Sequence, residues 1–210
     1  MSLPTPNKLV IALAILLAVA LSTASYATTK GLNQIVTPDI QPMGVLCTSF
    51  QDENAALGNP QQLQLELGLT DSFEVAIFQG FSPEQTVFNA ELGLVQKKYF
   101  LLSTGLLGAQ NKAKYQPFLE GGYYTGKAEI IAGIQRQNGA YLGVFGVSYQ
   151  ALPRLLIAAD YISGSSDFAT VGVTYAILPN LSFNPALYIS NASPHHAFGY
   201  GVLSWNVKVW

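Results

Sequence analysis

The chain has 210 residues, of which 50% are apolar and only 10% are charged, and its formal net charge is −2. An ordinary soluble domain has about 25% charged residues, so this composition disfavours a protein whose whole surface meets water. The small net charge also argues against electrostatic binding of nucleic acid. We therefore expect no nucleic-acid partner and an outer surface that is largely apolar.

The N-terminus has the pattern of an export signal. Lys8 supplies a positive charge, residues 9–21 are a short apolar stretch, and Ser25-Tyr26-Ala27 places small residues at positions −3 and −1 of a cleavage site. The apolar stretch is shorter than the ~20 residues of a membrane-spanning helix. We predict a signal peptide over residues 1–27, cleaved near Ala27, and a periplasmic lead-in over residues 28–42.

Residues 62–78 show the clearest structural pattern in the chain. Four leucines occupy alternate positions from Leu63 to Leu69, and the alternation resumes at Phe73 after a Thr-Asp-Ser turn. Successive strand side chains point to opposite faces, so this stretch predicts a β-hairpin with one apolar and one polar face.

Similar runs recur along the chain, and their length is close to the ~9–11 residues of a tilted membrane strand. Short turns alternate with longer loops between them, as an up-and-down barrel requires. The twelve predicted strands span about 43–51, 61–70, 73–80, 86–95, 99–107, 116–124, 127–135, 140–149, 155–163, 168–176, 181–190 and 198–209. The fold class is therefore all-β, an antiparallel transmembrane β-barrel over residues 43–210.

Two positions leave alternatives open. The turn at 124–127 is weakly marked, so ten strands is the alternative count. Pro185 lies inside a predicted strand, where it cannot donate to the ladder, and it predicts either a bulge or a later strand start.

The export signal ending at Ala27, the hairpin over residues 67–75 and the aromatic C-terminus over residues 205–210 together resemble bacterial outer-membrane β-barrel proteins, including porin-like transporters. The resemblance implies an outer-membrane location, contact with outer-membrane lipids, and recognition of the C-terminal strand by the barrel assembly machinery. In that class, the last strand usually ends in an aromatic residue in phase with the apolar face. Here Trp210 is out of phase with Leu203 and Trp205.

Placing the apolar side of each strand toward lipid leaves a set of inward polar residues. Charged side chains facing lipid are destabilising, which favours this placement. The pore-lining candidates are Glu66, Glu74, Asn89, Glu91, Glu120, Glu129, Asp160, Asn184, Asn206 and Lys208. Six of these ten are acidic, so we predict a passive channel for small polar or cationic solutes through an acidic lumen. The alternatives are a closed structural or interaction barrel that acts through its outer loops and, third in order, a membrane-embedded lipid hydrolase.

Other polar residues carry weaker hypotheses. Lys112 and Lys114 could contact lipopolysaccharide phosphates from an outer loop. His195 and His196 form a pair without nearby ligands, and Ser193 is poorly spaced for a membrane-embedded lipid hydrolase. We therefore predict no enzymatic activity, no catalytic residue, no cofactor and no metal site, and the oligomeric state stays open.

Overall fold

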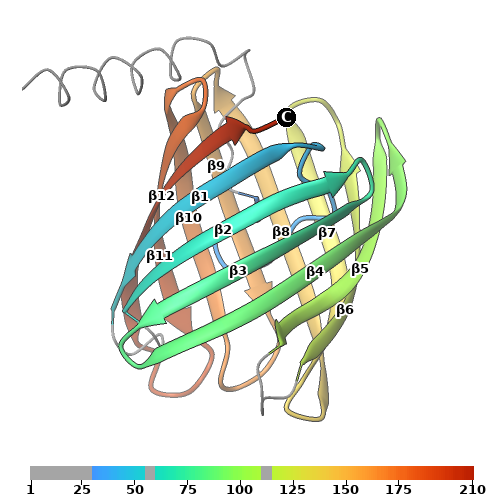
Figure 1. Ribbon diagram of the computed structural model, residues 1–210. Helices are drawn as coiled ribbons and strands as arrows, with labels where there is room; N and C mark the ends of the chain where they lie inside the picture. Colours follow the sequence, from blue (N-terminus) through green and yellow to red (C-terminus); the bar gives the residue numbers. More distant parts are fainter. Residues whose placement is uncertain (1–29, 55–59, 110–114) are drawn as a thin grey trace, which may run out of the picture.

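The computed structural model describes residues 30–54, 60–109 and 115–210. Twelve antiparallel strands form one closed barrel. Figure 1 shows these strands side by side around the barrel. The strands are β1 Val45–Glu53, β2 Gln61–Thr70, β3 Phe73–Phe81, β4 Glu84–Lys97, β5 Phe100–Ala109, β6 Gln116–Tyr124, β7 Ala128–Gln137, β8 Ala140–Leu152, β9 Leu155–Ile162, β10 Phe168–Leu178, β11 Leu181–Ser190 and β12 Ala197–Lys208. Within these ranges, the chain forms no apolar helix of membrane-spanning length.

Each strand pairs with its neighbours in sequence, and the ring closes where β1 meets β12. Val45, the first residue of β1, lies opposite Lys208, the last residue of β12. The turns that follow β2, β4, β6, β8 and β10 lie at this same end of the barrel, which we call the turn end. We call the opposite end the loop end.

The predicted strand count of twelve is confirmed, and the doubtful turn between β6 and β7 is present. The Thr125 amide donates to the Ala128 carbonyl at 2.8 Å. Gly126 has a φ of 82°, a left-handed conformation that favours glycine. The turn residue therefore explains why the chain reverses here without a longer loop.

Pro185 lies within β11, so neither a later strand start nor a bulge at this residue is needed. Pro185 has no amide hydrogen, so the backbone carbonyl of Val173, which lies opposite it on β10, would lack a donor. The Asn184 side chain supplies one, because its Nδ2 donates to the Val173 carbonyl at 3.1 Å. β11 can thus continue through a proline with its ladder completed by a side chain.

The outer face of the barrel exposes large apolar side chains on every strand. Examples are Ile130 at 56% and Phe145 at 53% exposure. Residues at alternate positions of the same strands, such as Ile131 at 1% and Val144 at 0%, point inward and are buried. An apolar surface of this extent is typical of a barrel wall in contact with lipid.

Exposed tyrosines gather near the two ends of this apolar surface. Four of them occupy the turn end and three the loop end, where the amphipathic ring of tyrosine suits a membrane–water interface. By strand position, the turn-end residues are Tyr99, Tyr123, Tyr149 and Tyr175, and the loop-end residues are Tyr115, Tyr141 and Tyr161. The apolar band between two aromatic girdles gives the barrel the surface of a transmembrane protein.

Candidate functional site in the barrel lumen

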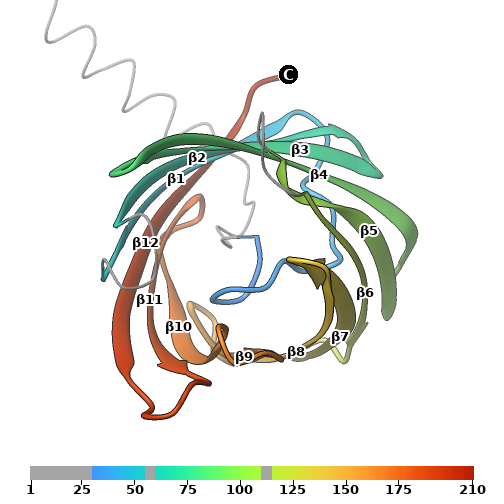
Figure 2. The same cartoon turned by 90° about the horizontal axis from the view of Figure 1, so that it is seen from below.

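Residues 30–44, which precede β1, lie inside the barrel and not beside it. Figure 2 shows this stretch, in blue, within the ring of strands. We call it the inner segment. The sequence predicts a periplasmic lead-in over residues 28–42 and gives no sign that this segment occupies the lumen.

The tip of the inner segment is Asn33, which is 5% exposed. Asp160 of β9 accepts hydrogen bonds from the backbone amides of Asn33, at 2.7 Å, and Gln34, at 3.3 Å. The Asn33 side chain donates to Thr170 of β10 at 3.0 Å. The backbone carbonyl of Asn33 accepts from the Tyr188 hydroxyl of β11 at 2.6 Å. Hydrogen bonds to a charged group contribute about 1.5–3 kcal/mol each, so the carboxylate of Asp160 is a main anchor of the tip.

Beside this tip, the inner segment packs on an apolar part of the wall. Leu32 and Ile35 form one buried cluster with inward side chains of β7, β8 and β9. The wall residues of this cluster are Ile131, Val144, Ala158 and Ile162. Burying an aliphatic side chain contributes about 1.5–3 kcal/mol. We call the inner face of β7–β11, which supplies both the apolar cluster and the bonds to Asn33, the holding wall.

Glycines in the holding wall let the segment approach closely. A Cβ atom on Gly172 would lie 2.2 Å from the Asn33 side-chain oxygen, and one on Gly146 would lie 2.6 Å from both Leu32 and Ile35. At either position a Cβ atom would force these side chains of the segment to shift. The wall is thus shaped for this segment.

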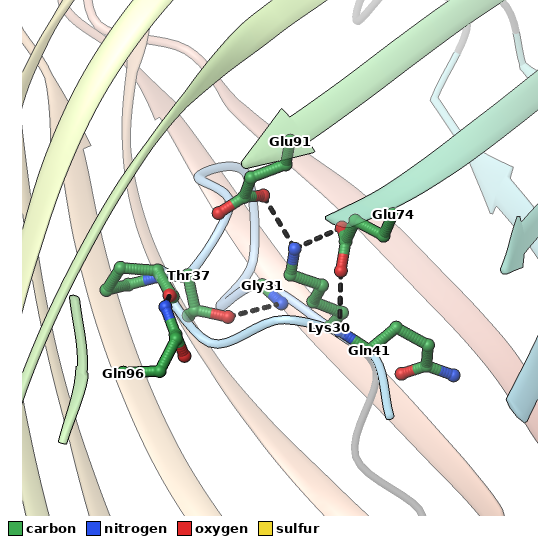
Figure 3. A network of polar contacts seen from close by, with 8 residues as sticks. Lys30, Gly31, Thr37, Gln41, Glu74, Glu91 and Gln96 are labelled. Carbon is green, nitrogen blue, oxygen red and sulfur yellow. Dashed lines mark hydrogen bonds and ion pairs between the residues drawn. The ribbon is translucent and has the colours of Figure 1, made fainter. Parts of the chain in front are cut away.

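On the other side of the lumen, Lys30 contacts two carboxylates of neighbouring strands (Figure 3). Its ammonium group donates to Glu91 of β4 at 2.6 Å and also to Glu74 of β3. The Lys30 side chain is only 4% exposed. Burial by itself would lower the pKa of Lys30, but Glu91 and Glu74 outweigh burial and raise the pKa above its ordinary value, so the ammonium stays charged.

The rest of the inner segment is bound on its way to β1. The side chain of Gln96 of β4 donates to the Pro38 carbonyl at 2.9 Å, and the backbone amide of Gln41 donates to the Glu74 carboxylate at 2.6 Å. Gln96 can point inward because the register of β4 against β5 shifts between Gly93 and Val95. A bulge of this kind re-aims the side chains that follow it. The inner segment is therefore bonded to strands around most of the ring.

A cavity of about 270 Å³ remains between the inner segment and the inner face of β1–β4, which we call the open wall. Its lining is rich in carboxylate, amide and phenol groups. From the open wall come Gln51, Glu53, Gln62, Gln64, Glu66, Glu74, Asn89 and Glu91, and Tyr188 and Tyr200 complete one side. Because β1 ends and β2 begins at the loop end, this lining runs from the loop end down to Lys30.

The structure places the predicted pore-lining residues in different surroundings. Nine of them have inward positions on their strands, whereas Lys208 is exposed at the turn end. Buried ones are Glu66, Glu74, Glu91, Glu120, Asp160, Asn184 and Asn206, and half-buried ones are Asn89 and Glu129. Four of the nine line the cavity, while Asp160 and Asn184 hydrogen-bond to the tip of the inner segment. Their effect on ion selectivity stays a prediction.

Several residues of the lumen were not among the predicted candidates. Gln51 and Glu53 line the cavity from β1, and the alternation of Val45, Cys47 and Ser49 with lipid-facing residues could have placed them inward. Lys30 had no such signal, since its segment has neither strand nor helix periodicity.

The loop between β11 and β12 gives its polar residues local partners. His195 Nδ1 lies 2.8 Å from the Ser190 carbonyl oxygen. The side-chain amide of Asn191 donates to the backbone carbonyls of Ile162 and Gly164. Both side chains thus contact backbone carbonyls at the loop end. Lys112, Lys114 and the predicted signal peptide lie outside the described residues.

No protein-family model and no curated protein matches the chain. Among solved structures, NanC porin has a TM-score of 0.56 at 9% identity, covering 76% of this chain and 98% of its own. KdgM porin has a TM-score of 0.56 at 13% identity, with 77% and 98% covered. KdgM porin in complex with disordered oligogalacturonate has a TM-score of 0.53 at 14% identity, with the same coverage. This chain is thus similar to these porins in architecture, and its fold is a porin-like twelve-stranded β-barrel.

Proposed function

We propose that this protein is a passive channel of the bacterial outer membrane for small polar and cationic solutes, narrowed by its own inner segment. The observation that carries the proposal is the charge of the lumen. Inward carboxylates come from seven strands, and Lys30 is the cation bonded to two of them in the described part of the chain. The carboxylates are Glu53, Glu66, Glu74, Glu91, Glu120, Glu129 and Asp160. A pore lined by carboxylates favours cations.

The porin neighbours support a channel and sharpen the choice of solute. One of them was solved with oligogalacturonate, a chain of acidic sugars. Carboxylates such as Glu53 and Glu66 along the cavity would repel an anion of that kind. We therefore infer a cationic or neutral polar solute for this chain.

The route that we propose runs along the open wall. The cavity beside β1–β4 reaches from the loop end to Lys30, and the inner segment fills the lumen on the holding wall. Outer-membrane barrels generally have short periplasmic turns and longer outer loops, so the loop end would face the outside. Solutes would enter there and pass the segment at Lys30.

The remaining features of the proposal concern export and assembly. Cleavage near Ala27 would leave residues 28 and 29 ahead of the inner segment. The apolar outer face would contact outer-membrane lipids, lipopolysaccharide included, and β12 would be the strand that the barrel assembly machinery recognises. Mass spectrometry of the protein from outer-membrane fractions would test both the cleavage and the location.

Conductance in planar bilayers tests the channel. We expect refolded protein in asymmetric KCl to show discrete conductance steps and a reversal potential of cation-selective sign. An anion-selective sign would contradict the acidic-lumen proposal. Heat-modifiable electrophoretic mobility establishes that the protein is folded in the same preparation.

A second candidate function is a closed barrel that acts through its loops, and the bonds from the inner segment to most of the ring favour it. This candidate predicts no conductance steps from inserted, heat-modifiable barrels. Liposome swelling with small neutral sugars separates the two candidates, because a closed barrel gives the same rate as empty liposomes.

A further inference from the structure

The group formed by Lys30, Glu66, Glu74 and Glu91 contains more acidic than basic side chains. Glu74 and Glu91 lie directly opposite each other on β3 and β4. On β2, Gly68 lies opposite Glu74, and Glu66 is the inward residue two positions before Gly68. Like charges at such positions repel each other. Lys30 supplies one positive charge against three carboxyl groups.

Two carboxylate oxygens in this group have no hydrogen-bond partner among the described residues. They are Glu66 Oε1 and Glu91 Oε1. Both side chains line the cavity and are at least nine-tenths buried, with 5% of Glu66 and 4% of Glu91 exposed. A buried acceptor without a donor is costly, so these oxygens can accept hydrogen bonds from a molecule that enters the cavity.

The ammonium group of Lys30 shows that these carboxylates can bind a primary ammonium. An ammonium group has three N–H donors, and Lys30 directs two of them at Glu74 and Glu91. The described residues contain no set of three or more metal-ligating side chains arranged to hold a metal ion. A primary ammonium therefore suits this group of carboxylates better than a metal ion does.

We propose that Glu66, Glu74 and Glu91 form a binding site for small organic molecules with a primary ammonium group, and that Lys30 occupies this site as a competitor tethered to the inner segment. An incoming ammonium reaches Glu66 through the cavity and takes over the bonds to Glu74 and Glu91. Release of Lys30 frees one of the anchors of the inner segment. The inference deepens the proposed function, on which it rests for the route of the solute.

Replacement of Lys30 tests the competition. A tethered group on a short linker acts at an effective concentration in the mM range, so a free ammonium must reach similar concentrations to displace it. We expect Lys30→Met to bind n-butylammonium, which has the shape of the lysine side chain, roughly tenfold or more tightly than the unchanged protein. Isothermal titration in detergent measures this without requiring an open pore.

Two controls separate the site from unspecific attraction. The neutral isostere n-butanol should bind both proteins equally, and Lys30→Met/Glu74→Gln should lose most of the gain. Equal affinity of the two proteins for n-butylammonium, with folding verified by heat-modifiable mobility, would overturn the proposal.

A second variant keeps the test open if Lys30→Met does not fold. Glu66→Gln leaves the bonds of Lys30 intact, because Glu66 is not among its hydrogen-bond partners. We expect it to weaken n-butylammonium binding at least threefold, and unchanged binding would contradict the role of Glu66. Binding of n-butylammonium by a channel without cation selectivity would overturn only the proposed function. Cation selectivity without n-butylammonium binding would overturn only the ammonium site.

Discussion

The holding wall and the open wall face the same inner segment in different ways. On β7–β11, Leu32 and Ile35 are buried among aliphatic side chains and Asn33 has hydrogen-bond partners on β9, β10 and β11. On β1–β4, the facing side chains are mostly amides and carboxylates, and a cavity of about 270 Å³ remains. One half of the lumen thus fixes the segment, while the other half keeps space and charge for a solute.

Loss of apolar contact at the holding wall should have the largest effect. Ile35→Ala removes a side chain that is 4% exposed from the buried cluster. Such a truncation costs about 2–5 kcal/mol, so we expect the inner segment to leave the wall in a large share of molecules. Conductance should rise several-fold, and trypsin should cleave after Lys30, which mass spectrometry detects.

The matched control is Ile134→Ala, since Ile134 is 50% exposed on the outer face. It should leave conductance and cleavage unchanged. If Ile35→Ala behaved like this control, the apolar cluster would not hold the segment.

A smaller effect is expected from the polar anchor of the same wall. Asp160→Asn replaces a carboxylate that accepts two backbone hydrogen bonds from the segment and one from Thr170. The loss of a charge-assisted bond costs about 1.5–3 kcal/mol. Tryptic cleavage after Lys30 should become faster than in the unchanged protein but slower than in Ile35→Ala.

Asp71→Asn, in the exposed turn between β2 and β3, is the control for this change. Faster cleavage in this control as well would show that the effect of Asp160→Asn is not specific to the holding wall.

The smallest effect is expected at the open wall, where charge rather than packing is changed. Glu53→Gln keeps an acceptor for Gln51, which donates to Glu53 at 2.9 Å, and removes one carboxylate from the cavity. The reversal potential should move toward zero in about 0.1 M KCl and change little in about 1 M, because the Debye length falls from ~10 Å to ~3 Å.

Tryptic cleavage of Glu53→Gln should match that of the unchanged protein. Glu84→Gln, exposed near the loop end of β4, should shift the potential less than Glu53→Gln. An equal shift in the two variants would indicate that charge at the rim, and not along the cavity, sets the selectivity.

The walls could be predicted from the sequence because their pattern is local. Alternation along residues 62–78 assigns leucines outward and Glu66 and Glu74 inward, and burial in the structure agrees with that assignment. Strand ends were less predictable. β4 pairs with β5 as far as Lys97, beyond a register shift that turns Gln96 toward the inner segment, and no local pattern signals this.

The inner segment could not be predicted, because its contacts are distant in sequence. Asn33 and Asp160 are 127 residues apart, and Lys30 and Glu91 are 61 apart. Inward glycines give no local signal of their partner either: a Cβ atom on Gly122 would lie 2.8 Å from Pro38 of the segment. Only the three-dimensional structure identifies which partner these glycines accommodate.

Closure of the ring between β1 and β12 has a consequence for the order of assembly. The inner segment is synthesised before every strand, but its partners are divided between β3–β4 at Lys30 and β9–β11 at Asn33. Its complete docking surface exists only after the last strands have arrived and the ring has closed. A segment that precedes every strand is thus among the last to reach its final position, and the bonds of Asn33 to β9 and β11 form only when these late strands are in place.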